Sequence, residues 1–191
     1  MTYFLIFISA VFVNNIVLTQ FLGVQSIFDV SKRINSALSF TAVVALIMTV
    51  SSVLIYFIQT LVLQPYGLEY LRTLAFIVLI VGLVQLTGFT FKSISKSWYM
   101  NYEIYRPHLT ANCVILGVAL LSINKNYDLS EYIVFAVSSA FGFGLVSLIF
   151  AGIQEQLKLL NLPKRMEGLP IILIAAGLLA MAFMGFVGIA K

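Results

Sequence analysis

The chain has 191 residues, of which 61% are apolar and 9% are charged, and its mean hydropathy is +1.06. Soluble domains average roughly 45–50% apolar and about 25% charged residues, so this composition excludes an ordinary soluble domain and indicates an integral membrane protein. The net charge of +4 does not indicate a nucleic-acid partner, because the basic residues are spread along the chain rather than gathered into one stripe.

Apolar stretches long enough to cross a bilayer recur along the whole chain. One crossing needs about 20 mainly apolar residues, and six such stretches cover roughly residues 2–23, 38–63, 73–91, 107–123, 132–154 and 169–190. The linkers between them leave no room for a soluble nucleotide- or flavin-binding domain. The sequence therefore predicts an all-α membrane protein, residues 1–191, with six transmembrane helices in one transmembrane domain.

The basic residues predict the orientation of this domain. With six crossings both termini lie on one side of the membrane, and the first, third and fifth linkers lie on the other. The positive-inside rule then places both termini on the outer face, because those three linkers hold most of the basic residues. They carry eight of the 11: Lys32, Arg33, Lys92, Lys96, Arg106, Lys158, Lys164 and Arg165.

The third linker and the fourth stretch carry further polar and aromatic signals. Pro107 is expected to open the fourth stretch, so that His108 stands at a helix start, where the helix dipole disfavours a protonated imidazole. A neutral, hydrogen-bonded ring is one interpretation of His108, and a ligand or proton-relay role is the other. Four aromatic side chains in the linker predict an interfacial belt at headgroup depth: Trp98, Tyr99, Tyr102 and Tyr105.

Two similar segments suggest that the chain is an internal repeat. The first reads NNIVL from Asn14 and the second reads NCVIL from Asn112, and Asn15 and Asn112 are 97 residues apart. Three crossings per half is an odd number, so halves of approximately 1–95 and 96–191 would insert in opposite orientations. Such inverted repeats place functional sites near the membrane midplane, at the interface of the halves.

Both copies of this segment are expected to contain broken helices. The fourth stretch is short, and the first one turns polar after Gly23; short or Gly-interrupted segments at matching positions indicate discontinuous half-helices. Backbone groups released by a break must be satisfied inside the protein. Asn14, Asn15 and Asn112 either satisfy them or line an ion path or cofactor pocket, and the two roles are compatible.

Cys113, the only cysteine, follows directly after Asn112. A lone cysteine in an apolar segment is often a small buried hydrophobe. The alternative is a ligand to a metal or an iron–sulfur cluster, but a cluster usually needs four thiolates, so other ligands would come from another chain. No carboxylate lies inside an apolar stretch, so a proton pump built on intramembrane acids would need them from elsewhere.

Four blocks of the sequence are distinctive: FVNNIVLTQFLG at 12–23, YLRTLAFIVLI at 70–80, LTANCVILGVALL at 109–121 and MEGLPIILIAAGLLAMAFMGF at 166–186. Together they resemble the RnfA/NqrE family of membrane subunits, and the Asn14–Asn15 pair is closer to the RnfA pattern than to the NqrE pattern. The resemblance implies a complex in a bacterial or archaeal cytoplasmic membrane that relays electrons between ferredoxin and NAD and moves Na⁺ or H⁺. It implies a homologous RnfE-like partner in the opposite orientation, and flavins on other Rnf-type subunits (B, C, D and G).

The resemblance also implies a cofactor. In the family, RnfA-like and RnfE-like chains each supply two cysteines to an intramembrane [2Fe-2S] cluster; one of them falls on Cys113, whereas the other falls on Gln25. An amide oxygen is a poor substitute for a thiolate on iron. Three explanations stay open: a substituted residue, a cluster with altered ligation, or a branch that has lost the cluster. A small inverted-repeat secondary transporter and a scaffold protein without redox chemistry are the alternative functions.

Overall fold

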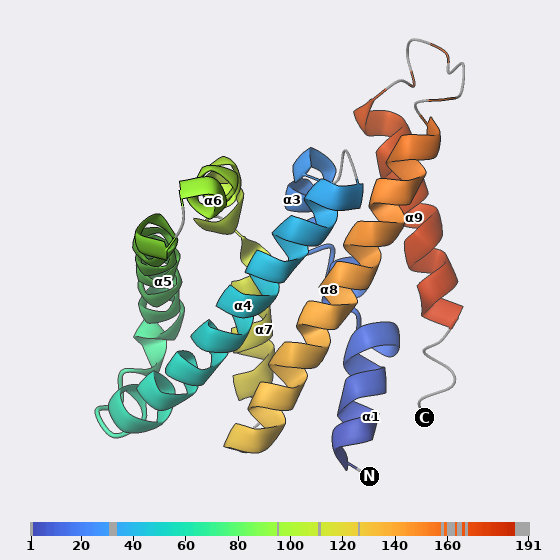
Figure 1. Ribbon diagram of the computed structural model, residues 1–191. Helices are drawn as coiled ribbons and strands as arrows, with labels where there is room; N and C mark the ends of the chain where they lie inside the picture. The colour runs from blue at the N-terminus through green and yellow to red at the C-terminus, as the bar shows by residue number, and fades with distance from the viewer. Residues whose placement is uncertain are drawn as a thin grey trace. The chain divides into compact units, whose positions relative to one another are not determined.

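The computed structural model describes residues 2–30, 34–94, 96–110, 112–125, 127–157, 159, 163, 166 and 168–185. Most of these residues are helical and none of them is in a β-strand, which confirms the predicted all-α class (Figure 1). Long helices follow from the composition, because a helix pairs its backbone groups within itself and so tolerates lipid. The elements are α1 Thr2–Ile8, the π-helical turn η1 Ser9–Val13, α2 Ile16–Gln20, α3 Val24–Val30, α4 Ile34–Ile58, the π-helical turn η2 Gln59–Leu63, the 3₁₀ turn η3 Glu69–Leu71, α5 Arg72–Ile94, α6 Lys96–Thr110, α7 Cys113–Asn124, α8 Leu129–Leu157 and α9 Leu169–Met184.

Fewer membrane spans are found by counting long continuous helices in the structure than by counting apolar stretches in the sequence. Among the described residues, three helical segments are long and apolar enough to cross a membrane: Ser36–Leu63, Glu69–Ser93 and Leu129–Leu157. The bent pair Tyr102–Thr110 and Cys113–Asn124 makes up to four, and Tyr3–Val13 and Leu169–Met184 are shorter apolar helices. The chain is thus a multi-pass helical membrane protein, whereas the six-span count stays a prediction.

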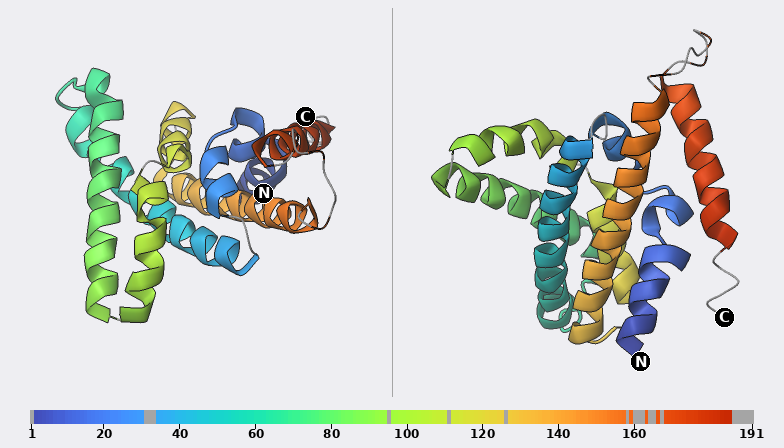
Figure 2. Two further views of the ribbon diagram at one scale, coloured as in Figure 1. Left: turned by 90° about the horizontal axis from the view of Figure 1, so that it is seen from above. Right: turned by 45° about the vertical axis from the view of Figure 1, so that its right-hand side comes forward.

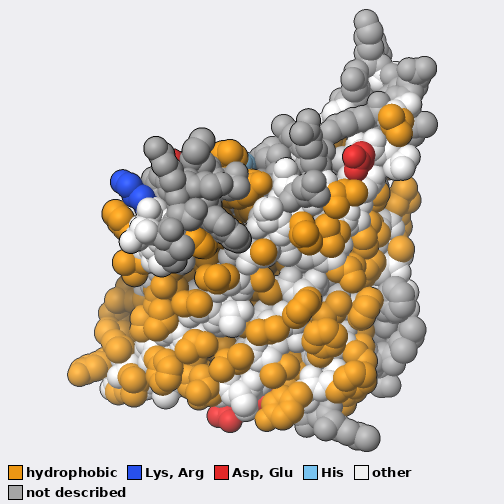
Figure 3. Space-filling view, in the orientation of Figure 1, with side chains coloured by type: hydrophobic (Ala, Val, Ile, Leu, Met, Phe, Trp, Pro, Cys, Tyr) orange, Lys and Arg blue, Asp and Glu red, His pale blue; other side chains and the backbone are white. Residues whose placement is uncertain are grey.

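The surface fits this class. Large hydrophobic side chains stand exposed on α4, α5 and α9, among them Leu38, Val78 and Leu178. Figure 3 shows hydrophobic side chains over most of the visible described surface, with few charged ones. Extended exposed apolar surface of this kind is unusual for a soluble monomer and is expected where lipid or another membrane protein covers the chain.

The helices pack into two compact units, which are described separately below. Unit 1 comprises residues 1–43 and 138–191, and unit 2 comprises residues 44–137. The helices α4 and α8 each contribute one part to each unit (Figure 1). This division concerns packing, whereas the predicted halves 1–95 and 96–191 concern sequence similarity, so the inverted repeat stays a prediction.

In unit 2, α5 and α6 form a helical hairpin and run side by side (Figure 2). Tyr102 of α6 fastens it: its hydroxyl donates to the backbone oxygen of Val84 and lies 2.9 Å from Thr87 Oγ1 on α5. Gly88 allows the close approach, because a Cβ there would lie 3.0 Å from Tyr102 Cε1.

The hairpin corrects three predictions about the third linker. The linker is largely the helix α6, and Pro107 lies inside this helix rather than opening the next segment. His108 is in the last turn of α6, so the prediction that it stands at a helix start was wrong. Tyr102 is only 2% exposed, so it is not part of an interfacial belt. The side chains of Trp98 and Tyr99 lie outside the described residues. So do most basic residues behind the predicted orientation, namely the side chains of Lys32, Arg33, Lys96, Lys158, Lys164 and Arg165.

The core of unit 1 forms where α4 meets α8. Phe40 and Phe143 pack with ring centroids 6.1 Å apart, and Phe28 of α3 meets Phe150 edge to face at 5.7 Å. Gly144 allows close contact of the two helices, because a Cβ at this position would lie 2.6 Å from Thr41 Cγ2. The small-residue pattern typical of packed membrane helices therefore has a direct steric meaning here.

Gly144→Ala is expected to lower the free energy of unfolding by about 1–3 kcal/mol, the usual cost of overpacking a core. The cause is the added methyl group, since Thr41 is β-branched and stiff in a helix. Unfolding of the purified chain in detergent, followed by circular dichroism, measures the change. Gly152→Ala, in the same helix with nothing within 4 Å of its Cβ, is the matched control and should not destabilise. Thr41→Ser removes the clashing methyl and should rescue Gly144→Ala; a failed rescue contradicts the steric explanation.

Candidate functional site: two asparagine-capped helix breaks

The first apolar segment breaks at the Asn14–Asn15 pair. The helix α1 passes into the π-helical turn η1, which ends at Asn14, and a new helix, α2, begins at Ile16. Asn15 is the N-cap of α2: its backbone is extended (φ −62°, ψ 114°), and its Oδ1 accepts a hydrogen bond of 3.1 Å from the amide of Val17. Asparagine is among the best N-caps, because its side-chain oxygen satisfies an amide that the helix leaves unpaired.

Asn15 also joins this break to α8. Its Nδ2 donates to the backbone oxygen of Val11 at 2.9 Å and to that of Gly142 at 3.0 Å, and the side chain is 1% exposed. Gly142 leaves the space for this contact, since a Cβ there would lie 3.0 Å from Asn15 Nδ2 and 3.2 Å from the oxygen of Ala10. The side-chain amide of Asn15 thus hydrogen-bonds three backbone groups, those of Val11, Val17 and Gly142. This is one of the two roles predicted for the asparagines, namely to satisfy backbone groups that a helix break releases.

Asn14 behaves differently from its neighbour. Its side chain is exposed, and its Nδ2 donates to Ser9 Oγ at 3.0 Å, within the same π-helical segment. The adjacent asparagines therefore have separate roles: Asn15 is a buried structural cap, and Asn14 presents its side chain at the surface of unit 1.

A second break follows at Phe21–Gly23, where the sequence predicted one. Phe21 has a positive φ of 54° and Gly23 one of 74°, and α3 begins directly afterwards at Val24. The helix α2 ends at Gln20 with Phe21 as its C-cap in the left-handed conformation, and Gly23 adopts its positive φ without strain. Gln25, the position of the second expected ligand, lies in the first turn of α3 with an exposed side chain.

The second copy of the repeat has a corresponding break in unit 2. The helix α6 ends at Thr110, α7 begins at Cys113, and the axes of Tyr102–Thr110 and Cys113–Asn124 differ by 48°. Asn112 caps α7 as Asn15 caps α2: its backbone is extended (φ −79°, ψ 103°), and its Oδ1 accepts from the amide of Val114 at 3.0 Å. The sequence similarity of the two segments is thus matched by the same local structure.

The two caps differ in what their Nδ2 groups do. Asn15 Nδ2 has two backbone acceptors, whereas Asn112, only 4% exposed, has a buried Nδ2 without a hydrogen-bond partner among the residues that the structure describes. A buried amide without a partner costs on the order of 1–3 kcal/mol. The second break therefore holds an unused donor next to the only cysteine of the chain.

Cys113 is the first residue of α7, and its side chain is exposed. The interpretation of Cys113 as a buried hydrophobe was therefore wrong. The N-terminal end of a helix stabilises negative charge, so this position suits a thiolate ligand. The exposed thiol is accessible to a group held by a second chain.

The donor set of this chain does not complete a cluster by itself. Among the described residues, no group of three or more His, Cys, Asp or Glu side chains could hold a metal ion. Cys113 fits the role of one thiolate ligand, and the amide of Gln25 does not fit the role of a second. Asn14, Asn15 and Gln25 belong to unit 1, and Asn112 and Cys113 belong to unit 2, so their common pocket stays a prediction.

Sequence reasoning missed several residues that the structure brings into play. The backbone oxygen of Gly142 accepts a hydrogen bond from Asn15, which is 127 positions earlier in the chain. The only local signal for close packing at this position is the glycine-rich run FGFG at 141–144. Gln59, in the π-helical turn η2, has both of its side-chain amide atoms buried without a hydrogen-bond partner in the described part of the chain. In the sequence, Gln59 stands near the end of an apolar stretch, and nothing in its neighbours distinguishes a buried side chain from that of an ordinary linker residue.

The fold and the breaks define a class: a multi-pass helical membrane protein whose apolar segments are interrupted at asparagine-capped half-helices. The profile described as "Rnf-Nqr subunit, membrane protein" matches residues 3–190. The chain belongs to this Rnf-Nqr family.

Curated relatives cover nearly the whole chain. The chain is 44% identical over 188 residues to the A-type subunit of the Na⁺-translocating ferredoxin:NAD⁺ oxidoreductase complex of Acetobacterium woodii, covering 98% of both chains. It is 44% identical to the A-type subunit of the ion-translocating oxidoreductase complex of Syntrophotalea carbinolica, covering 97% of this chain and 96% of the relative. The corresponding protein of Vibrio cholerae is 39% identical, covering 99% and 98%. The predicted relationship is confirmed.

Proposed function

We propose that this chain is the A-type subunit of an ion-translocating oxidoreductase complex in a bacterial or archaeal cytoplasmic membrane, with both termini on the outer face. The observation that carries the proposal is the exposed Cys113 at the start of α7, in a chain similar over nearly its full length to such subunits. By analogy with the named activity of the Acetobacterium woodii complex, the proposed reaction is electron transfer between ferredoxin and NAD, coupled to movement of Na⁺ or H⁺.

The proposed cofactor is a [2Fe-2S] cluster shared with an RnfE-like subunit that is inserted in the opposite orientation. When bound, such a cluster supplies one-electron transfer at membrane depth. Cys113 would hold it through Sγ, and the remaining thiolates would come from the partner, because this chain has a single cysteine. Flavins are assigned to the other Rnf-type subunits (B, C, D and G).

The remaining site residues hold the helix breaks. Asn112 caps α7 and so orients the first turn that carries Cys113. Asn15 fixes the first break to α8, and Asn14 presents an exposed amide beside it. Coupling of electron transfer to ion movement further requires that the ion and the reduced complex prefer the same conformation, since a ligand shifts an equilibrium only by its differential affinity.

The proposal is tested on the complex purified with its partner subunits. Iron and acid-labile sulfide are quantified, and the reduced sample is examined by electron paramagnetic resonance. A [2Fe-2S] signal with stoichiometric iron supports the shared cluster. Iron far below stoichiometry without a paramagnetic signal contradicts it.

Under the explanation that Gln25 is a substituted ligand, Gln25→Cys is expected to raise the iron content of the purified complex and to strengthen the paramagnetic signal, because a thiolate replaces an amide at the position where the resemblance implies a ligand. Gln20→Cys is the matched control, since Gln20 is also exposed and lies in the preceding helix α2. The control should leave the iron content unchanged. Equal iron content in wild type and Gln25→Cys contradicts the explanation that Gln25 is a substituted ligand.

A secondary transporter without redox chemistry is the second candidate, favoured by Gln25 and by the capped helix breaks, which are typical of transporter sites. Under that function the complex carries no cluster, and ion uptake into vesicles proceeds without reduced ferredoxin. A scaffold protein, the third candidate, predicts that Cys113→Ala leaves electron transfer intact.

A further inference from the structure

A small cavity, open to the surface, lies between α5 and α6, and Arg106 on its wall is one helical turn before the second helix break. Its volume is about 60 Å³, and it is lined by Gln85, Gly88, Phe89 and Lys92 of α5 and by Tyr102 and Arg106 of α6. One water molecule occupies about 30 Å³ of liquid. The cavity therefore accepts a compact polar group and is too small for an organic cofactor.

The walls of the cavity are held in place by the hairpin. The four residues of α5 are spaced i, i+3, i+4 and i+7, so they share one face of the helix, and Tyr102 and Arg106 are one turn apart on α6. The Tyr102 ring is fixed by its hydrogen bonds to α5 and by the close approach of Gly88. The cavity is thus a feature of two packed helices rather than a gap between mobile side chains.

The chemistry of the lining suits an anion. It contains an ammonium from Lys92, a guanidinium from Arg106 and a carboxamide from Gln85, and none of its six residues is acidic. Guanidinium and ammonium groups are the common ligands of phosphate oxygens. Figure 3 shows one small basic patch (blue) at the α5–α6 end of the visible face.

The surroundings of the cavity suit lipid. Phe89, which lines the cavity, is 69% exposed, and Leu86 beside it on α5 is 62% exposed. Lys92 is the first charged residue after the apolar part of α5, which forms one of the candidate spans. A cationic cavity continuous with exposed apolar surface matches a molecule that has both a phosphate and acyl chains.

We propose that this cavity binds the phosphate headgroup of an anionic phospholipid, with the acyl chains lying on Phe89 and Leu86. The predicted orientation is consistent, because it places the third linker on the cytoplasmic side. Anionic lipids of that leaflet attract basic residues, and basic pockets between membrane helices bind such headgroups. The bound lipid would contact both helices at the surface of the hairpin and so stabilise it, in addition to the buried hydrogen bonds of Tyr102.

The test is a lipid titration of the full-length chain in detergent, followed by native mass spectrometry. The probes are phosphatidylglycerol, phosphatidylcholine with the same acyl chains, and inorganic phosphate. The variant Lys92→Gln/Arg106→Gln should bind phosphatidylglycerol roughly 25-fold more weakly, five-fold for each cation, because one basic residue near an anionic membrane contributes about 1 kcal/mol. Phosphatidylcholine binding should not change, and inorganic phosphate should not displace phosphatidylglycerol.

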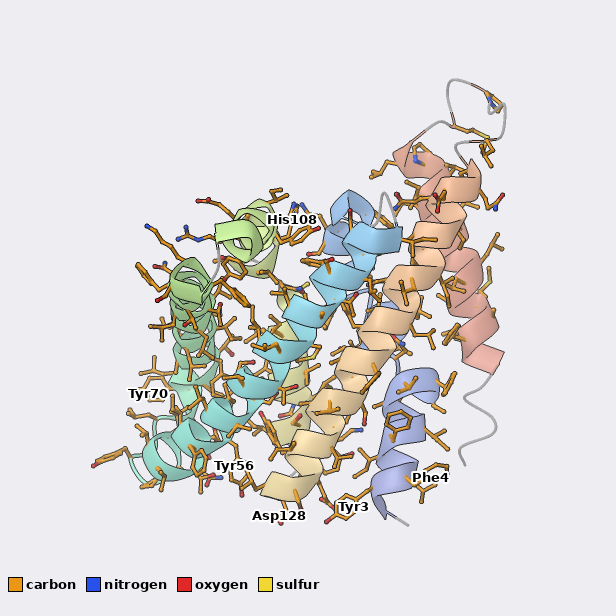
Figure 4. All side chains as sticks on the ribbon, in the orientation of Figure 1. Tyr3, Phe4, Tyr56, Tyr70, His108 and Asp128 are labelled. Carbon is orange, nitrogen blue, oxygen red and sulfur yellow. The ribbon has the colours of Figure 1, made fainter. Side chains whose placement is uncertain are left out.

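Two further variants keep the result interpretable. Lys125→Gln removes a cation three residues before Asp128 in the sequence. Figure 4 shows Asp128 at the opposite end of unit 2 from His108, which is two residues after Arg106 of the cavity. This control should therefore bind phosphatidylglycerol like wild type. Gly88→Ala keeps both cations but adds a methyl 3.0 Å from the Tyr102 ring, and it should weaken binding by narrowing the cavity. Thermal unfolding in phosphatidylcholine micelles confirms that each variant is folded.

Three outcomes overturn the proposal. Undiminished phosphatidylglycerol binding by the folded double variant, or an equal loss in Lys125→Gln, shows that the cavity is not the site. Displacement of phosphatidylglycerol by inorganic phosphate assigns the cavity to a soluble anion. Loss of a partner protein from the double variant, with lipid binding intact, assigns it to an acidic protein segment.

Discussion

Replacing Cys113 with serine is expected to abolish electron transfer by the purified complex and to leave the complex assembled. The side chain is exposed at the first residue of α7, so serine keeps the helix start and removes only the thiolate. Loss of a group that merely supports a metal ligand costs roughly 10–100-fold, and loss of the ligand itself should lower the rate by at least about 100-fold. Ferredoxin-dependent NAD reduction and the paramagnetic signal of the reduced complex measure the effect.

Thr110→Ser is the matched control for this substitution. Thr110 is exposed at the last residue of α6, on the other side of the same break, and its hydroxyl donates to the oxygen of Arg106, as a serine hydroxyl can. The control should retain the wild-type rate and signal. Full electron transfer in Cys113→Ser, with the subunits still assembled, contradicts a ligand role and favours a scaffold function.

Replacing Asn15 with alanine is expected to lower the free energy of unfolding by about 2–4 kcal/mol. Loss of an N-cap typically costs about 1 kcal/mol, and each of the two lost hydrogen bonds, from Nδ2 to the oxygens of Val11 and Gly142, costs about 0.5–1.5 kcal/mol. Unfolding in detergent, followed by circular dichroism, measures the change.

The other asparagines separate the contributions of Asn15. Asn14→Ala removes one exposed hydrogen bond and should change stability by less than about 0.5 kcal/mol. Asn112→Ala removes a cap without a cross-helix bond and should have an intermediate effect. Asn15→Asp keeps the capping oxygen but places a second carboxyl oxygen against the oxygens of Val11 and Gly142, so it should destabilise both through the lost donor and through repulsion there. Equal effects of Asn14→Ala and Asn15→Ala contradict the assigned roles.

The local signals in the sequence predicted the helix breaks well. Asn15 and Asn112 were recognised by their similar surroundings, and both prove to be N-caps with the same backbone conformation. Gly23 predicted a helix end because glycine accepts a positive φ, which it has in the structure. These features depend on a few neighbouring residues, and so they can be read from the chain alone.

Features that depend on tertiary contacts could not be predicted in the same way. Tyr102 was assigned to a headgroup belt because an aromatic hydroxyl in a polar linker usually lies there, but its partners are on α5, 15 and 18 positions earlier. Pro107 was taken as a helix start because proline is common there, whereas α6 continues through it. Hydropathy measures apolar length and not the continuity of the backbone, so the count of six crossings stays a prediction. The acceptor of Asn15 on Gly142 had no local signal at all.

The unequal bonding of the two capping amides has a consequence for motion. Separating α2 from α8 requires Asn15 to release Gly142, so the first break and the adjoining turn of α8 should move as one rigid body. Within the described part of the chain, Asn112 has no corresponding hydrogen bond from its Nδ2, and the turn that carries Cys113 can therefore tilt without breaking one. We expect hydrogen exchange in the complex to be slow at Val17 and faster at Val114, so that a repeat similar in sequence works with one fixed half and one moving half.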